Sequence, residues 1–440
     1  MKASRILTCV VAAATVLMIS LVGYGGSGAG NPIAHAASRP YAGQTVSALI
    51  AYPSPPASAL QQFTKATGIK VKWTNVDWDS LQTKITAAMS AHVYFADVTD
   101  VDWSRVGQYH ILKWFVPLNK YFSPGSLRSD MPQLSAFTVS GELVGMPFDS
   151  SYMVTTINTR DFARAGIKTM PKNFAQYNAD LHKLQRSHVN AHPLGIPLAA
   201  QEGLSTYWYE VTGALGGQVL SSSLKPQFTS PRSAGYRALA WIVNAYKSGL
   251  VPKANIDMSD TDEMQSEMAH NKVSTLFSDY AGQISTIYDV PGTSTVVGQV
   301  HYVPTPGQSG TGPNLDNPDG IGIPTTAHHV GAAVEFIRWF TNPRNQARWA
   351  GYNGPKNVIV GFPLPSRVSS LNMLVRARKA AQGQELATLL KTRSRPVFPN
   401  GPPPNYAAFS AAVNTSIHQA ALGSISVSQA IQRIAAAVHS

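Results

Sequence analysis

Acidic and aromatic side chains stand together where several predicted strands end. Tyr52 closes one apolar run, Asp77 and Trp78 follow the next, and Asp100 to Trp103 follow the third. Carboxylates accept hydrogen bonds from hydroxyl groups and aromatic rings cover apolar surfaces, so these side chains could together hold a small polar ligand. A strand-end aspartate is also a common helix cap, and for Asp100 the sequence leaves both interpretations open.

Motifs for other chemistry are missing from the sequence. His182, His188 and His192 lack the spacing of a metal-binding pair, and "DMSDTDEMQSE" lacks the central glycine of a calcium loop. Neither G-x-x-x-x-G-K-[ST] nor G-x-S-x-G occurs, so nucleotide hydrolysis and acyl transfer have no basis. We therefore expect no catalytic residue, no metal and no cofactor.

The elements that position these residues alternate between strand and helix. Strands are predicted at 44–52, 70–76 and 93–102, and helices at 58–69 and 78–91. This order predicts a parallel sheet covered by helices, in which ligands bind at the carboxyl ends of the strands.

A second set of elements follows residue 150. Strands are predicted at 152–158, 193–199 and 273–280, and residues 233–251 form an amphipathic helix that ends at Gly249. The sequence thus predicts an α/β fold with more than one sheet.

Length and charge limit the class of protein. The chain has 440 residues, of which only 13% are charged, and its formal net charge is +12. The basic residues are spread along the chain without a dense patch, so we expect no nucleic-acid partner.

The first residues resemble an export signal. Lys2 and Arg5 precede the uncharged stretch 6–22, and Ala34-His35-Ala36 offers a cleavage site, so residues 1–36 are predicted to be a signal peptide. The alternative is that this segment is kept as a membrane anchor. Cys9 is the only cysteine, so the mature chain would have no thiol chemistry.

Six phrases in order resemble the extracellular solute-binding proteins of carbohydrate ABC transporters, of the type that binds maltose and oligosaccharides. They are "LQQFTKATGIKVKW", "FADVTDVD", "GELVGMPFDSSYMVTTINTRDFARAGI", "YKSGLVP", "KVSTLFSDYAGQI" and "GIGIPTTAHHVGAAVEFIRWFTNPRNQARWA". The resemblance covers the chain from Thr45 onward. It implies a two-lobed periplasmic-binding-protein-like fold in which each lobe is a mainly parallel sheet flanked by helices.

The resemblance also implies where the chain crosses between the lobes. Crossings are expected at 147–149, near 319–320 and between 354 and 365. Residues 38–148 with 321–354 would form lobe one, and residues 149–320 with 355–440 would form lobe two. Glycine and proline suit such points, because a hinge concentrates backbone rotation in few residues.

Further ligand contacts are implied by the same resemblance. Candidates beyond the strand ends of lobe one are Asp149, Ser151, Glu202, Tyr207, Trp208, Asp279, Tyr280, Asp319 and Tyr406. Two adjacent rings are not expected to face the core together, so at least one of Tyr207 and Trp208 should reach the cleft. Tyr280 keeps the ring of the family's stacking aromatic, but Ser278 and Asp279 replace the usual turn residues.

The expected function is binding rather than catalysis. An exported monomer, periplasmic or at the cell surface, would close its lobes on a sugar and deliver it to a membrane permease. The alternatives are an exported glycoside hydrolase using carboxyl pairs such as Glu202 with Asp149 or Asp279, and a binding protein for a polyamine or a glycerol phosphodiester.

Overall fold

The computed structural model describes residues 39–259, 262–349, 364–399 and 401–438, and residues 41–440 form one compact unit. The predicted signal peptide lies outside the described residues, as does most of the third predicted crossing. Within the described part of the chain, no helix is long and apolar enough to span a membrane.

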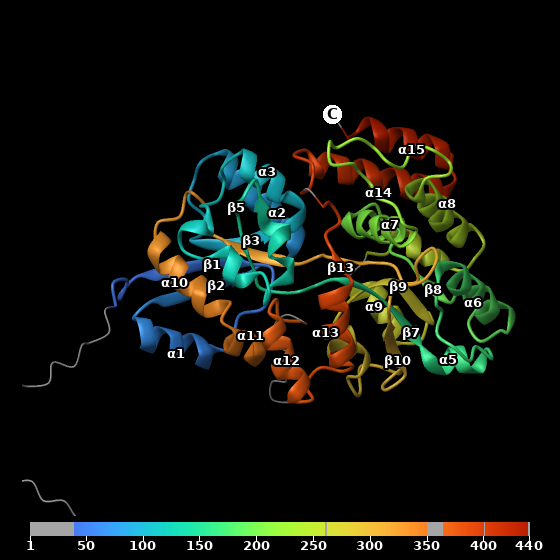
Figure 1. Cartoon of the computed structure of the whole chain (residues 1–440), viewed down its shortest axis with the longest axis horizontal. Helices are drawn as coiled ribbons and strands as arrows, with labels where there is room; N and C mark the ends of the chain where they lie inside the picture. The colour runs from blue at the N-terminus through green and yellow to red at the C-terminus, as the bar shows by residue number, and fades with distance from the viewer. Residues whose placement is uncertain (1–38, 260–261, 350–363, 400, 439–440) are drawn as a thin grey trace, which may run out of the picture. The chain divides into compact units, whose positions relative to one another are not determined.

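The first sheet contains the three strands predicted at the start of the chain. Its order is β2 (Lys70–Asn75), β1 (Thr45–Ile50), β3 (Val98–Asp102), β12 (Asp319–Gly322) and β6 (Met146–Pro147). β1 runs parallel to β2 and β3, as predicted, whereas β12 runs antiparallel to β3 and β6. The helices packed around this sheet are α1 (Ala57–Thr67), α2 (Trp78–Ser90), α3 (Val106–Ile111) and α10 (Val330–Phe340), as Figure 1 shows.

The second sheet has the order β10 (Val300–Val303), β7 (Met153–Asn158), β9 (Thr275–Tyr280) and β8 (Leu194–Gly195). Only the pair β8 and β9 is parallel, so the expectation of a mainly parallel sheet is wrong here. Its helices are α5 (Thr159–Arg164), α6 (Phe174–Arg186), α7 (Glu202–Ala214), α8 (Ala234–Lys247), α9 (Asp262–Ala269), α14 (Tyr406–Leu422) and α15 (Val427–Ala436).

Shorter elements complete the described chain. The remaining helices are α4 (Pro124–Leu127), α11 (Pro343–Trp349), α12 (Val368–Arg376), α13 (Gly383–Thr392), η1 (Trp103–Arg105), η2 (Leu118–Lys120), η3 (Pro132–Phe137), η4 (Lys253–Asp257) and η5 (Ile284–Tyr288). Two small ladders pair β4 (Thr138–Val139) with β5 (Glu142–Leu143), and β11 (Asn314–Leu315) with β13 (Ser394–Arg395).

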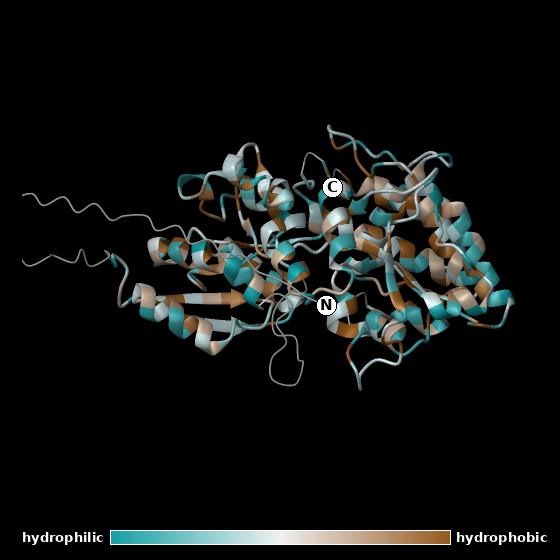
Figure 2. Cartoon of the chain, turned by 60° about the horizontal axis from the view of Figure 1, so that its bottom comes forward, coloured by the Kyte–Doolittle hydropathy of each residue, from teal (hydrophilic) through white to brown (hydrophobic). Residues whose placement is uncertain are grey.

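Helix α8 illustrates how the sequence sets an element. Leu239, Ile242 and Val243 recur at helical spacing and are buried. The Ser233 side chain accepts a hydrogen bond from the backbone N–H of Tyr236 and so caps the first turn. Beyond the helix, Gly249 adopts a φ of +74°, which favours glycine. Figure 2 shows the helices as mixtures of hydrophobic and hydrophilic residues, as expected of elements that cover a core.

Three connecting segments lie side by side between the two sheets. Asp149 forms a β-bridge with Pro365, and Tyr152 forms one with Asp316. The Ser366 hydroxyl donates to the backbone oxygen of Pro147 at 2.7 Å. The segment around residue 149 is therefore joined directly to the segments around residues 316 and 365.

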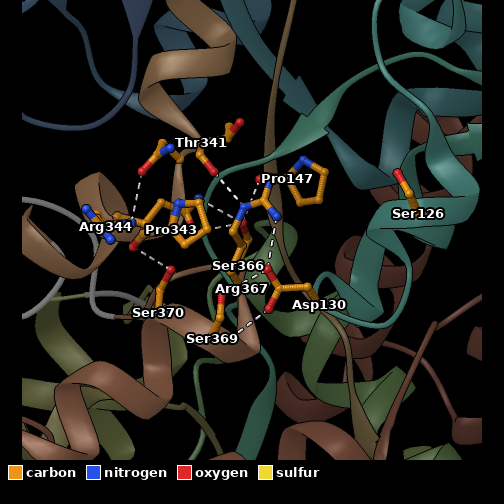
Figure 3. Close-up of polar contacts among 12 residues, drawn as sticks. Ser126, Asp130, Pro147, Thr341, Pro343, Arg344, Ser366, Arg367, Ser369 and Ser370 are labelled. Atoms are coloured by element: carbon orange, nitrogen blue, oxygen red, sulfur yellow. Dashed lines mark hydrogen bonds and ion pairs between the residues drawn. The ribbon is translucent and has the colours of Figure 1, made fainter. Parts of the chain in front are cut away.

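An ion pair supports the third of these segments where it enters α12 (Figure 3). Arg367 donates to Asp130 Oδ2 at 3.0 Å and to the backbone oxygen of Thr341 at 2.6 Å. Asp130 also accepts from the backbone N–H and the hydroxyl of Ser369. Although burial opposes it, these hydrogen bonds and the Arg367 charge lower the pKa of Asp130 below its ordinary value.

Candidate ligand-binding cavity

A cavity of 510 Å³ lies where the connecting segments meet the ends of strands from both sheets. Tyr52 follows β1, Asp102 ends β3 and Trp103 begins η1, whereas Tyr280 ends β9 on the opposite side. Asp319, the first residue of β12, also lines it. The cavity thus lies at the carboxyl ends of β1, β3 and β9, where the sequence predicts ligand binding, and beside the start of β12.

Strand direction explains which end of each strand lies beside the cavity. β3 and β9 run toward the cavity and end there, but β7 and β12 begin beside it, after Ser151 and at Asp319. Both of these strands enter their sheets directly from a connecting segment, so they run away from the cavity and pair antiparallel with β9 and β3.

The floor of the cavity is a linked set of acidic groups. The Tyr52 hydroxyl donates to Asp319 Oδ2 at 2.5 Å and lies 3.5 Å from Asp149 Oδ2. Asp149 also accepts from the Ser151 hydroxyl at 2.6 Å and from the backbone N–H of Asp319 at 3.0 Å. Burial raises the pKa of Asp149 to about 6. Burial and then the Asp149 charge raise the pKa of Asp319 well above its ordinary value.

A second acidic group lies at the start of α7. Glu202 lines the cavity and accepts hydrogen bonds from the hydroxyls of Tyr406 and Ser410. Burial raises the pKa of Glu202 to about 7, against the effect of those hydrogen bonds. Asp102 lines the cavity beside it, paired with Arg105 at 3.3 Å and capping η1 through the backbone N–H of Ser104.

Aromatic rings form another part of the wall. Trp103 is only 7% exposed, lies 6.3 Å from the ring of Phe398 in a stacked arrangement, and donates its indole N–H to the Asn317 side chain. Tyr52 meets Phe148 edge-on at 5.2 Å. These contacts fix the orientation of the Trp103 and Tyr52 rings in this arrangement of the chain.

Seven of the predicted site residues line the cavity, namely Tyr52, Trp78, Trp103, Ser151, Glu202, Tyr280 and Asp319. The other six lie outside its lining, namely Asp100, Asp149, Tyr207, Trp208, Asp279 and Tyr406. Asp149 and Tyr406 lie directly behind it, because they hydrogen-bond to Asp319 and Glu202.

The placement of Tyr207 and Trp208 corrects the expectation that one of them reaches the cleft. Trp208 is fully buried, meets Phe228 edge-on at 5.2 Å and donates its indole N–H to the backbone oxygen of Gly235 at 2.8 Å. Tyr207 is 1% exposed and packs toward Phe277. Adjacent rings can both enter the core here because α8 and α14 pack against α7 in addition to the sheet. The helix presents its N-terminal turn to the cavity instead.

Asp100 and Asp279 support the wall from behind. Asp100 Oδ2 accepts a hydrogen bond from the backbone N–H of Ala51 at 2.6 Å. Asp100 is therefore neither a ligand contact nor a helix cap. Asp279 accepts from Thr156 at 2.9 Å and Tyr288 at 2.8 Å, and from Gln265, which lines the cavity. Burial raises the pKa of Asp279 to about 6.

Sequence reasoning missed the amides and small polar residues of the wall. These are Ser104, Gln201, Thr206, Ser259, Gln265, Gln283 and Asn317. Only Asn317 carries a usable signal, because it precedes Pro318 and the predicted crossing. Among the described residues, no group of histidine, cysteine and acidic side chains could hold a metal ion.

Comparison with known structures places this arrangement in a fold. The chain is similar to maltose-bound MalE3 from T. maritima, with 18% identity, a TM-score of 0.77, and coverage of 90% of this chain and 99% of that one. An ABC transporter solute-binding protein from Agrobacterium radiobacter K84 in complex with ribitol shares 18% identity at a TM-score of 0.76, with coverage of 90% of this chain and 98% of that one. A solute-binding protein from Thermotoga lettingae TMO bound to tagatose shares 18% identity at a TM-score of 0.74, with the same two coverages. The two-lobed α/β fold is therefore confirmed.

The family itself is shown by sequence. No curated protein matches the chain. The family model described as bacterial extracellular solute-binding protein matches residues 47–347, which is more than half of the chain. The protein thus belongs to the bacterial extracellular solute-binding protein family.

Proposed function

We propose that this protein binds a sugar or polyol in the cavity and delivers it to the permease of an ABC importer. One observation carries the proposal: carboxylates and amides line the same cavity as Tyr52, Trp78, Trp103 and Tyr280. Such a wall offers acceptors for hydroxyl groups and flat apolar faces for C–H groups. Solved structures of the same fold contain maltose, ribitol, tagatose and mannitol.

The delivery step rests on closure of two lobes with the boundaries expected from the sequence, 38–148 with 321–354 and 149–320 with 355–440. The bridge between Asp149 and Pro365 and the bonds around Asp319 support these boundaries, because they lie where the chain leaves one sheet for the other. A ligand that touches both walls stabilises the closed state by its difference in affinity between the two states. The protein would act as an exported monomer cleaved after Ala36.

A glycerol phosphodiester fits the cavity poorly. No lysine, arginine or histidine is among the described residues that line it, so a phosphate would lack a cationic partner. A glycoside hydrolase would have to use the lining carboxyls as an acid and a nucleophile or base. The hydroxyls of Tyr406 and Ser410 already hold Glu202 in place, an arrangement suited to binding a ligand.

The test is a thermal-shift screen of the mature protein against maltose, maltotriose, chitobiose, ribitol, D-tagatose and D-mannitol, with calorimetry on each hit. A ligand that binds only the folded state raises the unfolding midpoint, by about 2.7 kcal/mol of stability at a hundredfold excess over Kd. At least one sugar or polyol should do so. Absence of any shift would reject the proposal, and release of shorter sugars from maltotriose would replace it with hydrolysis.

A further inference from the structure

We infer that the cavity selects its ligand by charge, binding a sugar that carries a protonated amino group and rejecting sugars that carry a carboxylate or phosphate. The inference rests on the proposed function, because it specifies the class of sugar that the same cavity takes.

The charged side chains on the wall are all acidic. They are Asp102, Glu202 and Asp319, and no described lining residue is basic. This contrasts with the chain as a whole, which has 35 basic against 23 acidic residues. The charged residues of the cavity wall are therefore opposite in sign to the net charge of the protein.

Two of these carboxyl groups have no basic partner within salt-bridge distance among the described residues. Asp102 is paired with Arg105, but Asp319 receives a hydrogen bond from Tyr52, and Glu202 receives its bonds from hydroxyl groups. A carboxylate has about four lone-pair sites, so these neutral donors leave acceptor capacity for a ligand. An ammonium group would supply both the donors and the missing charge.

A second layer of acid lies behind the floor. Asp149 and Asp100 are fully buried, and Asp100 Oδ1 has no hydrogen-bond partner. The N-terminal turn of α7 would by itself favour an anion, but Glu202 already occupies its first position. An anionic ligand would thus face two layers of carboxyl groups with no cation among the described residues of the wall.

The aromatic residues agree with this assignment. Trp78, Trp103 and Tyr280 line the same cavity as the carboxyl groups. The face of an aromatic ring attracts a cation, and more strongly where water is excluded. Rings and carboxylates around one cavity therefore suit a ligand that carries an amine on a polar framework with C–H groups.

Ligand binding should also move protons. Asp319 lies among Tyr52, Asp149, Asp100 and Asp102, none of which is cationic. Glu202 faces Tyr406, Ser410, Asp102 and Arg105. An adjacent ammonium group favours the ionised carboxylates, so binding of an amine near neutral pH should release protons to the buffer, whereas binding of a neutral sugar should not.

The experiment compares matched ligands by calorimetry at pH 7 in two buffers of different ionisation enthalpy. The probes are D-glucose, D-mannose and D-galactose, each with its 2-amino sugar and its uronic acid, and spermidine as an amine without a sugar. In at least one series the amino sugar should bind about tenfold more tightly than the parent hexose, as a charge-assisted hydrogen bond allows, and the uronic acid about tenfold more weakly. Only the amino sugar should release protons.

Variants separate the cavity from the rest of the surface. Asp319→Asn and Glu202→Gln keep the size of the side chain but remove its charge, so each should reduce the ratio of amino-sugar affinity to hexose affinity, whatever happens to the hexose affinity itself. Glu335→Gln is the control, because Glu335 lies on α10 and does not line the cavity. The thermal midpoint of each unliganded variant reports whether it folds.

The outcomes distinguish this inference from the proposed function. A uronic acid that binds as tightly as its hexose, or an amine preference that survives both substitutions, overturns the inference alone. Binding of spermidine without any sugar overturns the sugar assignment and keeps the selection for charge. If none of the probes binds and the sugar screen also fails, both are rejected.

Discussion

Trp103 is the aromatic residue best placed to separate ligand contact from folding, because it lines the cavity while its edge is held by Asn317. We expect Trp103→Ala to weaken ligand binding by about 1 kcal/mol or more, since it removes a large contact surface. Calorimetry with the best sugar of the screen measures this. Unchanged affinity would assign the ring to the core.

Trp208→Ala is the matched comparison, because Trp208 lies in the core rather than on the wall. We expect it to lower the free energy of unfolding by about 3–5 kcal/mol, as is usual for deleting a buried aromatic side chain. The folded fraction should bind ligand with nearly normal affinity. Urea unfolding gives the first quantity, and a large loss of affinity with normal stability would contradict the placement.

Whether a residue could be assigned to the cavity wall from the sequence depended on its position relative to a predicted strand. Trp78, Trp103 and Tyr280 could be placed on the wall because each follows or ends a strand of recognisable pattern. Trp208 could not, because its environment depends on how the chain around Phe228 and Gly235 packs back onto α7. The glutamines of the wall carried no signal, since an amide side chain is usually a solvated surface group.

At the scale of elements, Asp130 acts as an external cap for α12. The residue at the N-cap position, Arg367, makes no side-chain capping bond, whereas Asp130 accepts from the backbone N–H of Ser369 (Figure 3). We expect Asp130→Ala to destabilise the protein by about 0.5–2 kcal/mol, as loss of a cap does.

Asp130→Asn separates the two roles of this side chain. It keeps an oxygen that can accept from Ser369 but loses the ion pair with Arg367, so its cost should be clearly smaller. Urea unfolding of both variants makes the comparison. Equal losses would mean that the ion pair, and not the cap, stabilises this junction.

The direction of individual strands was the part of the fold that local pattern did not settle. The strand-helix-strand order correctly predicted parallel β1, β2 and β3. It did not predict that β7 runs antiparallel to β9, because hydrophobic alternation is the same in either direction. Direction follows from the point at which the connecting segment enters the sheet, which is a property of the tertiary structure.

At the scale of the whole molecule, buried carboxyl groups predict an unusual dependence of stability on pH. Burial raises the pKa of Asp100 and Glu210 to about 8, of Glu202 to about 7, and of Asp279 and Asp316 to about 6. A group whose pKa is higher in the folded state binds its proton more tightly there. Its stabilising contribution is complete below the ordinary pKa and is lost as pH rises through the folded value.

We therefore expect the unfolding midpoint to fall as pH rises from about 5.5 to 8.5, within the window of these folded pKa values. Asp100→Asn should flatten the upper part of the profile, because it removes a group with a folded pKa of about 8. Calorimetric scans at constant ionic strength measure the midpoints. A midpoint that stays constant over this range would show that the groups titrate normally.

The position of β12 has a consequence for the order in which the two sheets can be completed. β12 lies between β3, which ends at Asp102, and β6, yet it begins only at Asp319, after every strand of the second sheet. Until residue 322 has been synthesised, β3 keeps an open edge and the first sheet cannot close. Pairing across such a distance is slow. The first sheet can therefore be completed only after every strand of the second sheet is already part of the chain.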